Sequence, residues 1–278
     1  MITTLDGLIN ALKNNGSAAV IDLASLANQT AGQYASLWRA TGIPGQGAIP
    51  GTTPSIPTNA AAGAIPFTNQ TAPARAYLAW ASLASSLSAI TIEFVDRVAH
   101  MGGLVLNVSP AAQTITGLDL STLGLAADRR GPANYSEISW ALETYTDGGA
   151  TASNATINVT YDDASTGNLN VQAVGGTLRA SRLLPLTPLI PTAQQGKFIR
   201  GINSVTLSAS TGTAGNFGFT AMRPLAAITL PLANKAEVAD WAQLGAPWVP
   251  NDACLVMRAL CSTTSTGTLR GLLRVIYG

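Results

Sequence analysis

After Arg75 the chain consists largely of short apolar and β-branched segments, arranged in pairs around turn-forming residues. Such pairs are typical of antiparallel strands. The clearest turn is Asp147-Gly148-Gly149, because Asp-Gly sequences favour tight hairpins. The four pairs are RAYLAWASL with AITIEFVDRV, ISWALETYT with ATINVTYDD, INSVTLSA with GNFGFTAM, and ACLVMRALC with TLRGLLRVIY.

Residues 75–278 are therefore predicted to be mainly β. We expect an antiparallel β-sandwich or jelly-roll-like barrel of about eight to ten strands. The same pattern fits one sandwich or two smaller ones, residues 75–174 and 175–278, divided near Val174-Gly175.

Two further signals interrupt or introduce these strands. A Ser-Thr-Gly tripeptide begins at Ser165, Ser210 and Ser265, each before an alternating or apolar run. Its glycine can adopt positive φ, and its hydroxyls can bind turn backbone. One helix is expected after Asn234 and Glu237, which have the spacing of a capping box.

Residues 1–74 differ from the rest and are predicted to form a partly helical region followed by an extended arm. Apolar residues spaced as in a helix occupy Leu5 to Leu12, and Asn15-Gly16 follows as a stop signal. The next segment fits two structures. Asp22 could cap a second helix, or Val20-Ile21 could begin a strand.

The arm is the uncharged stretch from Ile43 to Pro73, which holds six of the fifteen prolines of the chain. Proline favours extended backbone, whereas disordered segments usually carry charge. The stretch could lie across a neighbouring subunit, or it could be a long loop packed on its own domain. For the first case we predict assembly contacts at its recurring apolar residues, Ile43, Ile49, Ile56, Ile65 and Phe67.

The charge content is low. Charged residues make up 10% of the chain, and fifteen basic and fourteen acidic side chains give a net charge of +1. An average soluble domain has about 25% charged residues. A nucleic-acid-binding face needs clustered basic residues, so we expect no nucleic-acid partner. No run of about 18 apolar residues occurs, so we expect no membrane partner. A sparsely charged surface suits a protein covered by copies of itself or by partners.

The N-terminus lacks the basic start and small-residue cleavage site of a secretory signal. Cys254 and Cys261 would lie about 23 Å apart on one strand, too far for a disulfide. We therefore expect both thiols to be buried and reduced, as in a cytoplasmic product.

Residues capable of catalysis or metal binding are sparse, and we predict no enzyme, no cofactor and no metal. The single histidine, His100, has no Gly-x-Ser-x-Gly element to partner it. The polar stretch around Asp162, Asp163 and Asn168 could bind calcium but is better explained as a hairpin tip. The carboxylate pairs Glu93 with Asp96 and Glu137 with Glu143 lack glycosidase geometry on extended strands. Trp80 and Trp140 are expected in a core or a subunit interface.

Three blocks resemble segments of uncharacterised structural proteins of tailed-bacteriophage virions. They are LWRATGIPGQG (Leu37 to Gly47), NSVTLSASTGTAGNFGFTAMRPL (Asn203 to Leu225) and DACLVMRALCSTTSTGTLRGLL (Asp252 to Leu273), together about a fifth of the chain. The blocks contain no defined functional motif, so the resemblance implies no catalytic or binding residue. It implies a virion protein.

Combined with the low charge, the resemblance predicts a non-enzymatic bacteriophage virion structural protein, above all a capsid decoration (cement) protein that stabilises the head lattice. We expect a homo-oligomer, a trimer at three-fold sites, in contact with the major capsid protein or other virion proteins. It would be made and assembled in the host cytoplasm. The alternative is a head-fibre or tail component that binds a host receptor or glycan. A glycan-cleaving virion enzyme is a third possibility.

Overall fold

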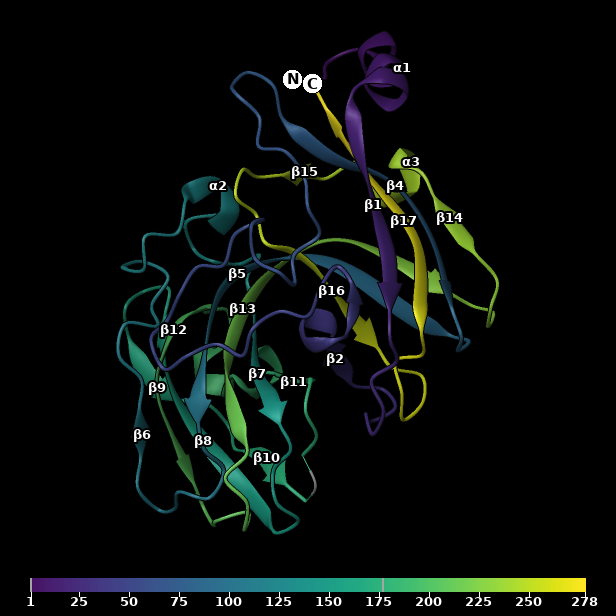
Figure 1. The fold of residues 1–278 in the computed structure, drawn as a ribbon. Coiled ribbons are helices and arrows are strands. Elements are labelled where there is room, and N and C mark those ends of the chain that lie inside the picture. The colour runs from purple at the N-terminus through teal and green to yellow at the C-terminus, as the bar shows by residue number, and fades with distance from the viewer. Residues whose placement is uncertain (1, 177) are drawn as a thin grey trace. The chain divides into compact units, whose positions relative to one another are not determined.

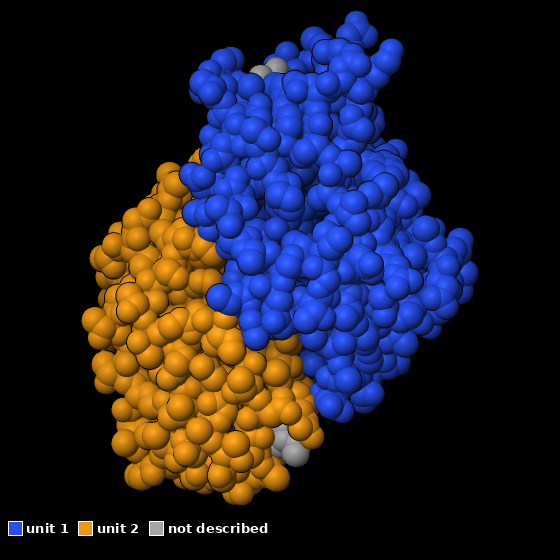
Figure 2. Space-filling model, viewed as in Figure 1, with its two compact units in different colours: residues 1–48, 58–96, 224–278 blue, residues 49–57, 97–223 orange. Residues whose placement is uncertain are grey.

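A computed structural model describes residues 2–176 and 178–278 (Figure 1). The chain forms two compact units (Figure 2). The first unit comprises Met1–Ala48, Thr58–Asp96 and Pro224–Gly278, and the second comprises Ile49–Pro57 and Arg97–Arg223. The second unit is therefore inserted into the sequence of the first.

The first unit has two β-layers. One is a six-stranded sheet with the order β14-β4-β17-β1-β3, in which β15 also pairs with β4. The other layer contains β2, β16 and the beginning of β5. The bounds are β1 Gly16–Leu23, β2 Tyr34–Ser36, β3 Gly42–Ile43, β4 Ala76–Ser85, β5 Ile90–Leu104, β14 Glu237–Ala239, β15 Trp248–Val249, β16 Leu255–Leu260 and β17 Leu269–Tyr277.

The second unit repeats this plan. A five-stranded sheet has the order β10-β8-β12-β6, with β9 also paired to β8. The facing layer contains β11, β7 and the beginning of β13. The bounds are β6 Gln113–Thr114, β7 Ser139–Thr146, β8 Ala152–Tyr161, β9 Thr166–Asn168, β10 Gln172–Gly175, β11 Arg182–Pro185, β12 Ile199–Leu207 and β13 Asn216–Leu230.

Helices are short and few among the described residues. The α-helices are α1 (Leu5–Asn14), α2 (Ala127–Arg130) and α3 (Trp241–Leu244), and the 3-10 turns are Leu37–Arg39, Thr187–Leu189 and Thr192–Gln194. The predicted mainly β, antiparallel fold is confirmed.

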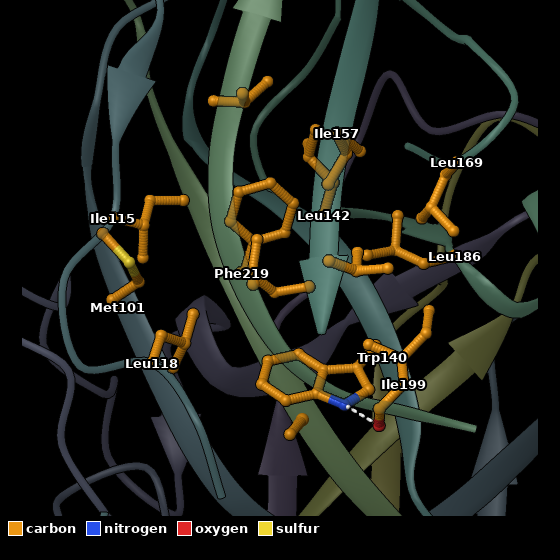
Figure 3. Close-up of a cluster of buried hydrophobic side chains, with 14 of the residues drawn as sticks. Met101, Ile115, Leu118, Trp140, Leu142, Ile157, Leu169, Leu186, Ile199 and Phe219 are labelled. Atoms are coloured by element: carbon orange, nitrogen blue, oxygen red, sulfur yellow. Dashed lines mark hydrogen bonds between the residues drawn. The ribbon is translucent and has the colours of Figure 1, made fainter. Parts of the chain in front are cut away.

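Each unit has its own core, to which both of its layers contribute. In the first unit, Ile21 and Leu273 of the six-stranded sheet share a buried cluster with Phe94 and Met257 of the facing layer. In the second unit, Ile157 shares a cluster with Leu142 and Phe219 (Figure 3). Trp140 is buried there, and its Nε1 donates to the Ile199 carbonyl over 2.9 Å (Figure 3). Each unit is thus a β-sandwich, since alternate residues of both layers point inward.

The four strand pairs predicted from the sequence exist as strands but not as hairpins. β4 and β5, β7 and β8, β12 and β13, and β16 and β17 each lie in different sheets. The turn at Asp147-Gly148-Gly149 shows why a hairpin does not form there. Gly148 donates to the Leu178 carbonyl, and a side chain on Gly149 would lie 1.8 Å from the Thr211 carbonyl oxygen. These glycines carry the chain across the sandwich, next to other loops.

The N-terminal region is only partly as predicted. The first helix is confirmed as α1, which Thr4 caps by accepting from the Gly7 N–H. The second segment is the strand β1, paired with β17 over eight residues, so the helical alternative is wrong. Because β1 lies inside a sheet, residues 2–42 are an integral part of the first unit.

The expected helix after Asn234 begins later than predicted. Residues Glu237–Ala239 form β14, and α3 starts at Trp241 with Asp240 and Gln243 as its capping box. Of the three Ser-Thr-Gly glycines, Gly212 and Gly267 have positive φ. Gly167 instead lies in β9.

The compact units divide the chain elsewhere than at the boundaries expected from sequence. Residues 1–74 contribute to both units, and the strands on either side of Val174-Gly175 belong to the second unit. Two sandwiches are present, but the division runs through β5 and β13, each of which supplies residues to both.

Candidate assembly surface

The outer face of the six-stranded sheet carries a row of exposed apolar side chains. Strand register places Val238 of β14 beside Ser82 of β4, Ser82 beside Leu272 of β17, and Leu272 beside Val20 of β1. Val238, Leu272 and Val20 are 52%, 41% and 51% exposed. These three residues, with half-buried Ser82 among them, are called the apolar row below. Single exposed apolar residues are ordinary, and three on neighbouring strands, with Ser82 between Val238 and Leu272, make this face a candidate interaction surface.

The local sequence explains how the row arises. In β1, Ala19, Ile21 and Leu23 are buried and point into the core. The alternate residues Val20 and Asp22 therefore point outward, because successive side chains on a strand face opposite sides. An outward valine adds nothing to the core.

An ion pair borders the apolar row on one side. Arg270 Nε lies 3.1 Å from Asp22 Oδ1, and the two side chains are 73% and 53% exposed. Exposed pairs of this kind contribute little to folding stability. Ile43 of β3 lies beside Asp22 and is also exposed. On the other side, half-buried Trp80 lies beside Arg274.

Helix α1 covers the far end of the same face. Its Ala11 packs with Ala79 of β4 and Ile276 of β17. Leu5 and Ile9 on α1 remain 63% and 52% exposed. The sheet face thus carries apolar side chains at the row and on α1, with Asp22, Arg270 and Arg274 among them, and the chain itself covers one end of it.

The five predicted arm contacts do not share one environment. Ile65 and Phe67 are buried in the core of the first unit, and the Ile65 N–H donates to the Leu255 carbonyl over 2.7 Å. Ile56 packs against the core of the second unit, and Ile49 is half-buried. Ile43 alone among the five is mostly exposed. In this structure the stretch packs on its own chain, with residues in both units.

Trp38 explains two of the four glycines in this stretch, Gly47 and Gly63. The Gly47 N–H donates to the Trp38 carbonyl, and Trp38 Nε1 donates to the Ala48 carbonyl. A side chain on Gly47 or Gly63 would lie 2.2 or 2.6 Å from atoms of the indole ring. The backbone can approach the ring this closely only because these residues lack Cβ. An assembly role for the stretch remains a prediction.

Each unit contains a triad of Arg, Glu and Tyr. In the first unit, Arg258 Nη2 lies 2.6 Å from Glu93 Oε2, and the Tyr34 hydroxyl donates to Glu93 Oε1 over 2.5 Å. Burial, followed by the bond to Glu93, raises the pKa of Tyr34. The guanidinium also stacks 4.5 Å from the Tyr34 ring centre. These side chains bind one another, an arrangement that braces adjacent strands.

The second triad is fully buried. Arg97 Nη2 lies 2.7 Å from Glu143 Oε2, and neither side chain is exposed. The Tyr145 hydroxyl and the Thr220 hydroxyl also donate to Glu143. Burial raises the pKa of Tyr145. Buried charges are tolerated when they are paired and hydrogen-bonded in this way.

His100 belongs to this second cluster and not to a catalytic site. It is buried, and its Nδ1 accepts from Arg97 Nε over 2.8 Å. Burial, with the nearby Arg97 charge, lowers the pKa of His100 to about 2. The imidazole is therefore neutral at neutral pH and engaged with an arginine, which suits a structural role.

The other candidate groups are engaged separately. Asp163 lies 2.8 Å from Lys197 Nζ and accepts from Ser165, and these contacts lower the pKa of Asp163. Asp162 instead accepts from the Phe198 N–H, as expected for a structured hairpin tip. The carboxylates Glu93, Asp96, Glu137 and Glu143 have partners of their own in Arg258, the Cys254 N–H, Arg223 and Arg97. Within residues 2–176 and 178–278, no cluster of three His, Cys, Asp or Glu could hold a metal.

Two shallow hollows lie on the first unit. One, of about 450 Å³, is lined by Glu93, Arg258 and the run Pro224 to Ala227. The other is lined by Asp22, Thr41, Arg270 and neighbouring small residues. Neither has tryptophan or tyrosine among its described lining residues. Of the tryptophans, Trp38 and Trp140 are buried, which confirms the core expected for Trp140.

Cys254 and Cys261 are buried and not joined in a disulfide. No described helix has the length and apolarity needed to cross a membrane.

Sequence reasoning missed the apolar row. Its signal is present in β1 and β17, where Val20 and Leu272 interrupt outward positions that are otherwise polar or small.

Comparison with known proteins gives little. No protein-family model matches this chain, and no curated protein matches it. Among solved structures, the T=1 particle derived from infectious bursal virus aligns over 95% of this chain and 78% of its own, at 11% identity and a TM-score of 0.21. The VP2 subviral particle of infectious bursal disease virus gives 12% identity and a TM-score of 0.20, over 95% and 80%. At these scores the likeness does not establish a common fold.

Proposed function

We propose that this chain is a non-enzymatic structural protein of a virion, working through contacts with copies of itself and with neighbouring subunits. The observation that carries the proposal is the apolar row, in which three apolar side chains, each between 41% and 52% exposed, lie in line across the sheet. The low charge of the chain agrees with it, since a sparsely charged surface needs cover to stay soluble.

The more specific role we propose is capsid decoration in a bacteriophage. The resemblance of Asn203 to Leu225 and Asp252 to Leu273 to phage virion segments supports it. A cement protein stabilises a lattice by burying surface between subunits, which requires rigid sandwiches and no chemistry. The partners would be the major capsid protein and other copies, with a trimer expected at three-fold sites.

Copy number in purified particles tests this role. Particles from cells carrying the encoding genome would be quantified by mass spectrometry against the major capsid protein. A ratio near one supports lattice decoration. A handful of copies per particle would move the protein to the tail or neck, and its absence from particles would overturn the virion role.

The second candidate is a fibre or tail component that binds a glycan or receptor. The hollow beside Glu93 and Arg258 favours it, because a carboxylate and a guanidinium together can bind sugar hydroxyls. Against it, the two groups already bind each other and Tyr34. Binding to a glycan array that is lost in Arg258→Ala but kept in Arg179→Ala would favour this candidate.

A further inference from the structure

We propose that Val20 and Leu272, the part of the apolar row on β1 and β17, form the contact surface for a second copy of this chain, related by a two-fold axis that runs along the strands between β1 and β17. The inference rests on the proposed function, because it names the partner that covers this face. It is carried by the strand register of the first unit and by the charges beside the row.

The register defines what such an axis would bring together. Each outward residue of β1 pairs with one residue of β17 in the same copy. Rotation about the axis places that β1 residue opposite the matching β17 residue of the second copy. Val20 then faces Leu272 of the second copy, and Leu272 faces its Val20. A two-fold contact of this kind uses the same patch on both partners.

The charges favour a second copy as the occupant. Asp22 and Arg270 are cross-strand neighbours, mostly exposed and of opposite sign. The proposed axis places Asp22 opposite Arg270 of the second copy, and Arg270 opposite its Asp22. Every charge at this border therefore meets its opposite, which is the complementarity expected of an interface.

The same charges exclude the other two-fold arrangement of the two faces. An axis running across the strands along the apolar row would place β17 over β17. Arg270 and Arg274 lie on either side of Leu272 in that strand. Arg270 would therefore face Arg274 of the second copy, and Arg274 would face its Arg270. Like charges directly opposite are unfavourable, and the axis along the strands avoids them.

Helix α1 is compatible with the proposed axis. It covers Ala79 of β4 and Ile276 of β17, while Gly16 and Ala18 of β1 stay exposed and small. Rotation places the helix of the second copy on the β1 side, where these small residues leave room. Exposed Leu5 and Ile9 would then lie at the border of the contact.

The contact is modest in size. The proposed axis lays β17 over β1 and β4 over the two-residue strand β3, whereas β14 falls outside the overlap. Two fully overlapping strands about 4.8 Å apart, each offering about six residues, make a face on the order of 200 Å². A stable interface buries about 800 Å² on each partner. The pair should therefore be weak in dilute solution and stronger when copies are held close together in a lattice. It is also distinct in mass from a trimer.

A charge-exchange experiment tests the proposal, with sedimentation equilibrium over a wide range of protein concentration. Asp22→Arg and Arg270→Asp should each weaken the wild-type dimer about tenfold or more, because each places like charges across the contact. An equimolar mixture of the two variants should associate again, since the two arginines of one variant would meet the two aspartates of the other. Within each copy the pair remains broken, so restoration in the mixture can only be intermolecular.

Asp147→Arg and Arg179→Asp are the matched control, because that exposed ion pair lies on the second unit. Neither variant nor their mixture should change the association. Circular dichroism would confirm that all variants fold. Recovery in the mixture of the Asp22→Arg and Arg270→Asp variants supports the proposal.

Two outcomes would contradict the proposed two-fold contact. A wild-type protein that stays monomeric to its solubility limit overturns the two-fold contact, as does a dimer unaffected by Asp22→Arg and by Val20→Asp. The proposed virion role would survive either result if the protein is abundant in purified particles. If the mixture of charge variants associates but the protein is absent from purified particles, the proposed virion role is wrong and the dimer stands.

Discussion

The outer faces of the two large sheets differ in one respect that decides how the molecule can be used. In the second unit, the outward residues of β8 and β12 include asparagine, threonine and serine, and several bind one another. Asn158 accepts from Asn203 over 2.9 Å and donates to Asn168 over 2.7 Å. In the first unit, the corresponding face carries Val20, Leu272 and Val238.

Both sheets belong to antiparallel sandwiches with apolar interiors, so the fold does not require this difference. A row of amide and hydroxyl groups that hydrogen-bond one another is stable in contact with water. A line of exposed valine and leucine gains from being covered. The same architecture therefore presents an outer face with hydrogen-bonded polar groups in the second unit and an outer face with exposed apolar side chains in the first unit.

The two Arg-Glu-Tyr triads give the largest expected contrast between the units. Glu143→Gln leaves the fully buried Arg97 guanidinium without a counter-charge, and breaking such a pair costs about 3–5 kcal/mol of folding stability. Glu93→Gln alters a pair at the surface edge, where the Arg258 and Glu93 side chains are 9% and 16% exposed, and should cost about 1 kcal/mol. Urea unfolding measures both, and equal losses would contradict the contrast.

The acid response of the second unit comes next in size. The unfolded imidazole titrates near 6.5, whereas folding lowers the pKa of His100 to about 2. The unfolded state therefore binds more protons between these values, so stability falls as pH drops below 6.5, by up to about 1.4 kcal/mol per pH unit. Between about pH 6.5 and pH 5 we expect a loss of about 1.5 kcal/mol.

His100→Gln is the control for this effect, because His100 is the single histidine of the chain. The variant should lack the loss between about pH 6.5 and pH 5 that urea unfolding finds in the wild type. An identical pH dependence in both proteins would show that His100 is not the group responsible.

The packed proline-rich loop offers a third comparison, within one stretch of chain. A methyl group at Gly63 would lie 2.6 Å from the Trp38 ring, whereas Gly51 has nothing within 4 Å. Gly63→Ala should therefore cost about 1–3 kcal/mol by overpacking, and Gly51→Ala should be near neutral. Unfolding followed by tryptophan fluorescence checks both. A harmless Gly63→Ala would mean that the loop does not rest on Trp38.

Exchanging the character of the two outer faces should affect folding least and association most. Val20→Thr with Leu272→Thr makes the first face resemble the second, and Thr156→Val with Thr206→Val does the reverse on paired residues of β8 and β12. Surface changes alter stability by about 0.5 kcal/mol or less. Light scattering should show association lost in the first variant and gained in the second. If association is unchanged in both variants, the polarity of the outer face does not control self-association.

Much of the secondary structure could be predicted, because period-two alternation is a local signal. The eight segments read as strands are strands, and Leu5 to Leu12 is helical. The start of α3 was misplaced because Asn234 with Glu237 and Asp240 with Gln243 have the same spacing, and only the second pair forms the hydrogen bonds of a capping box.

The sequence by itself determined a mainly β chain, its reduced cysteines, the burial of Trp140 and a surface poor in charge. Each follows from residue type or from spacing within a few positions. Only the tertiary structure decided the pairing of the strands, because a turn such as Asp147-Gly148-Gly149 can close a hairpin or cross a sandwich. Pairing depends on contacts between residues far apart in sequence, such as Val20 with Leu272. The packing of the uncharged loop on Trp38 and the exposure of the apolar row likewise follow from the tertiary structure.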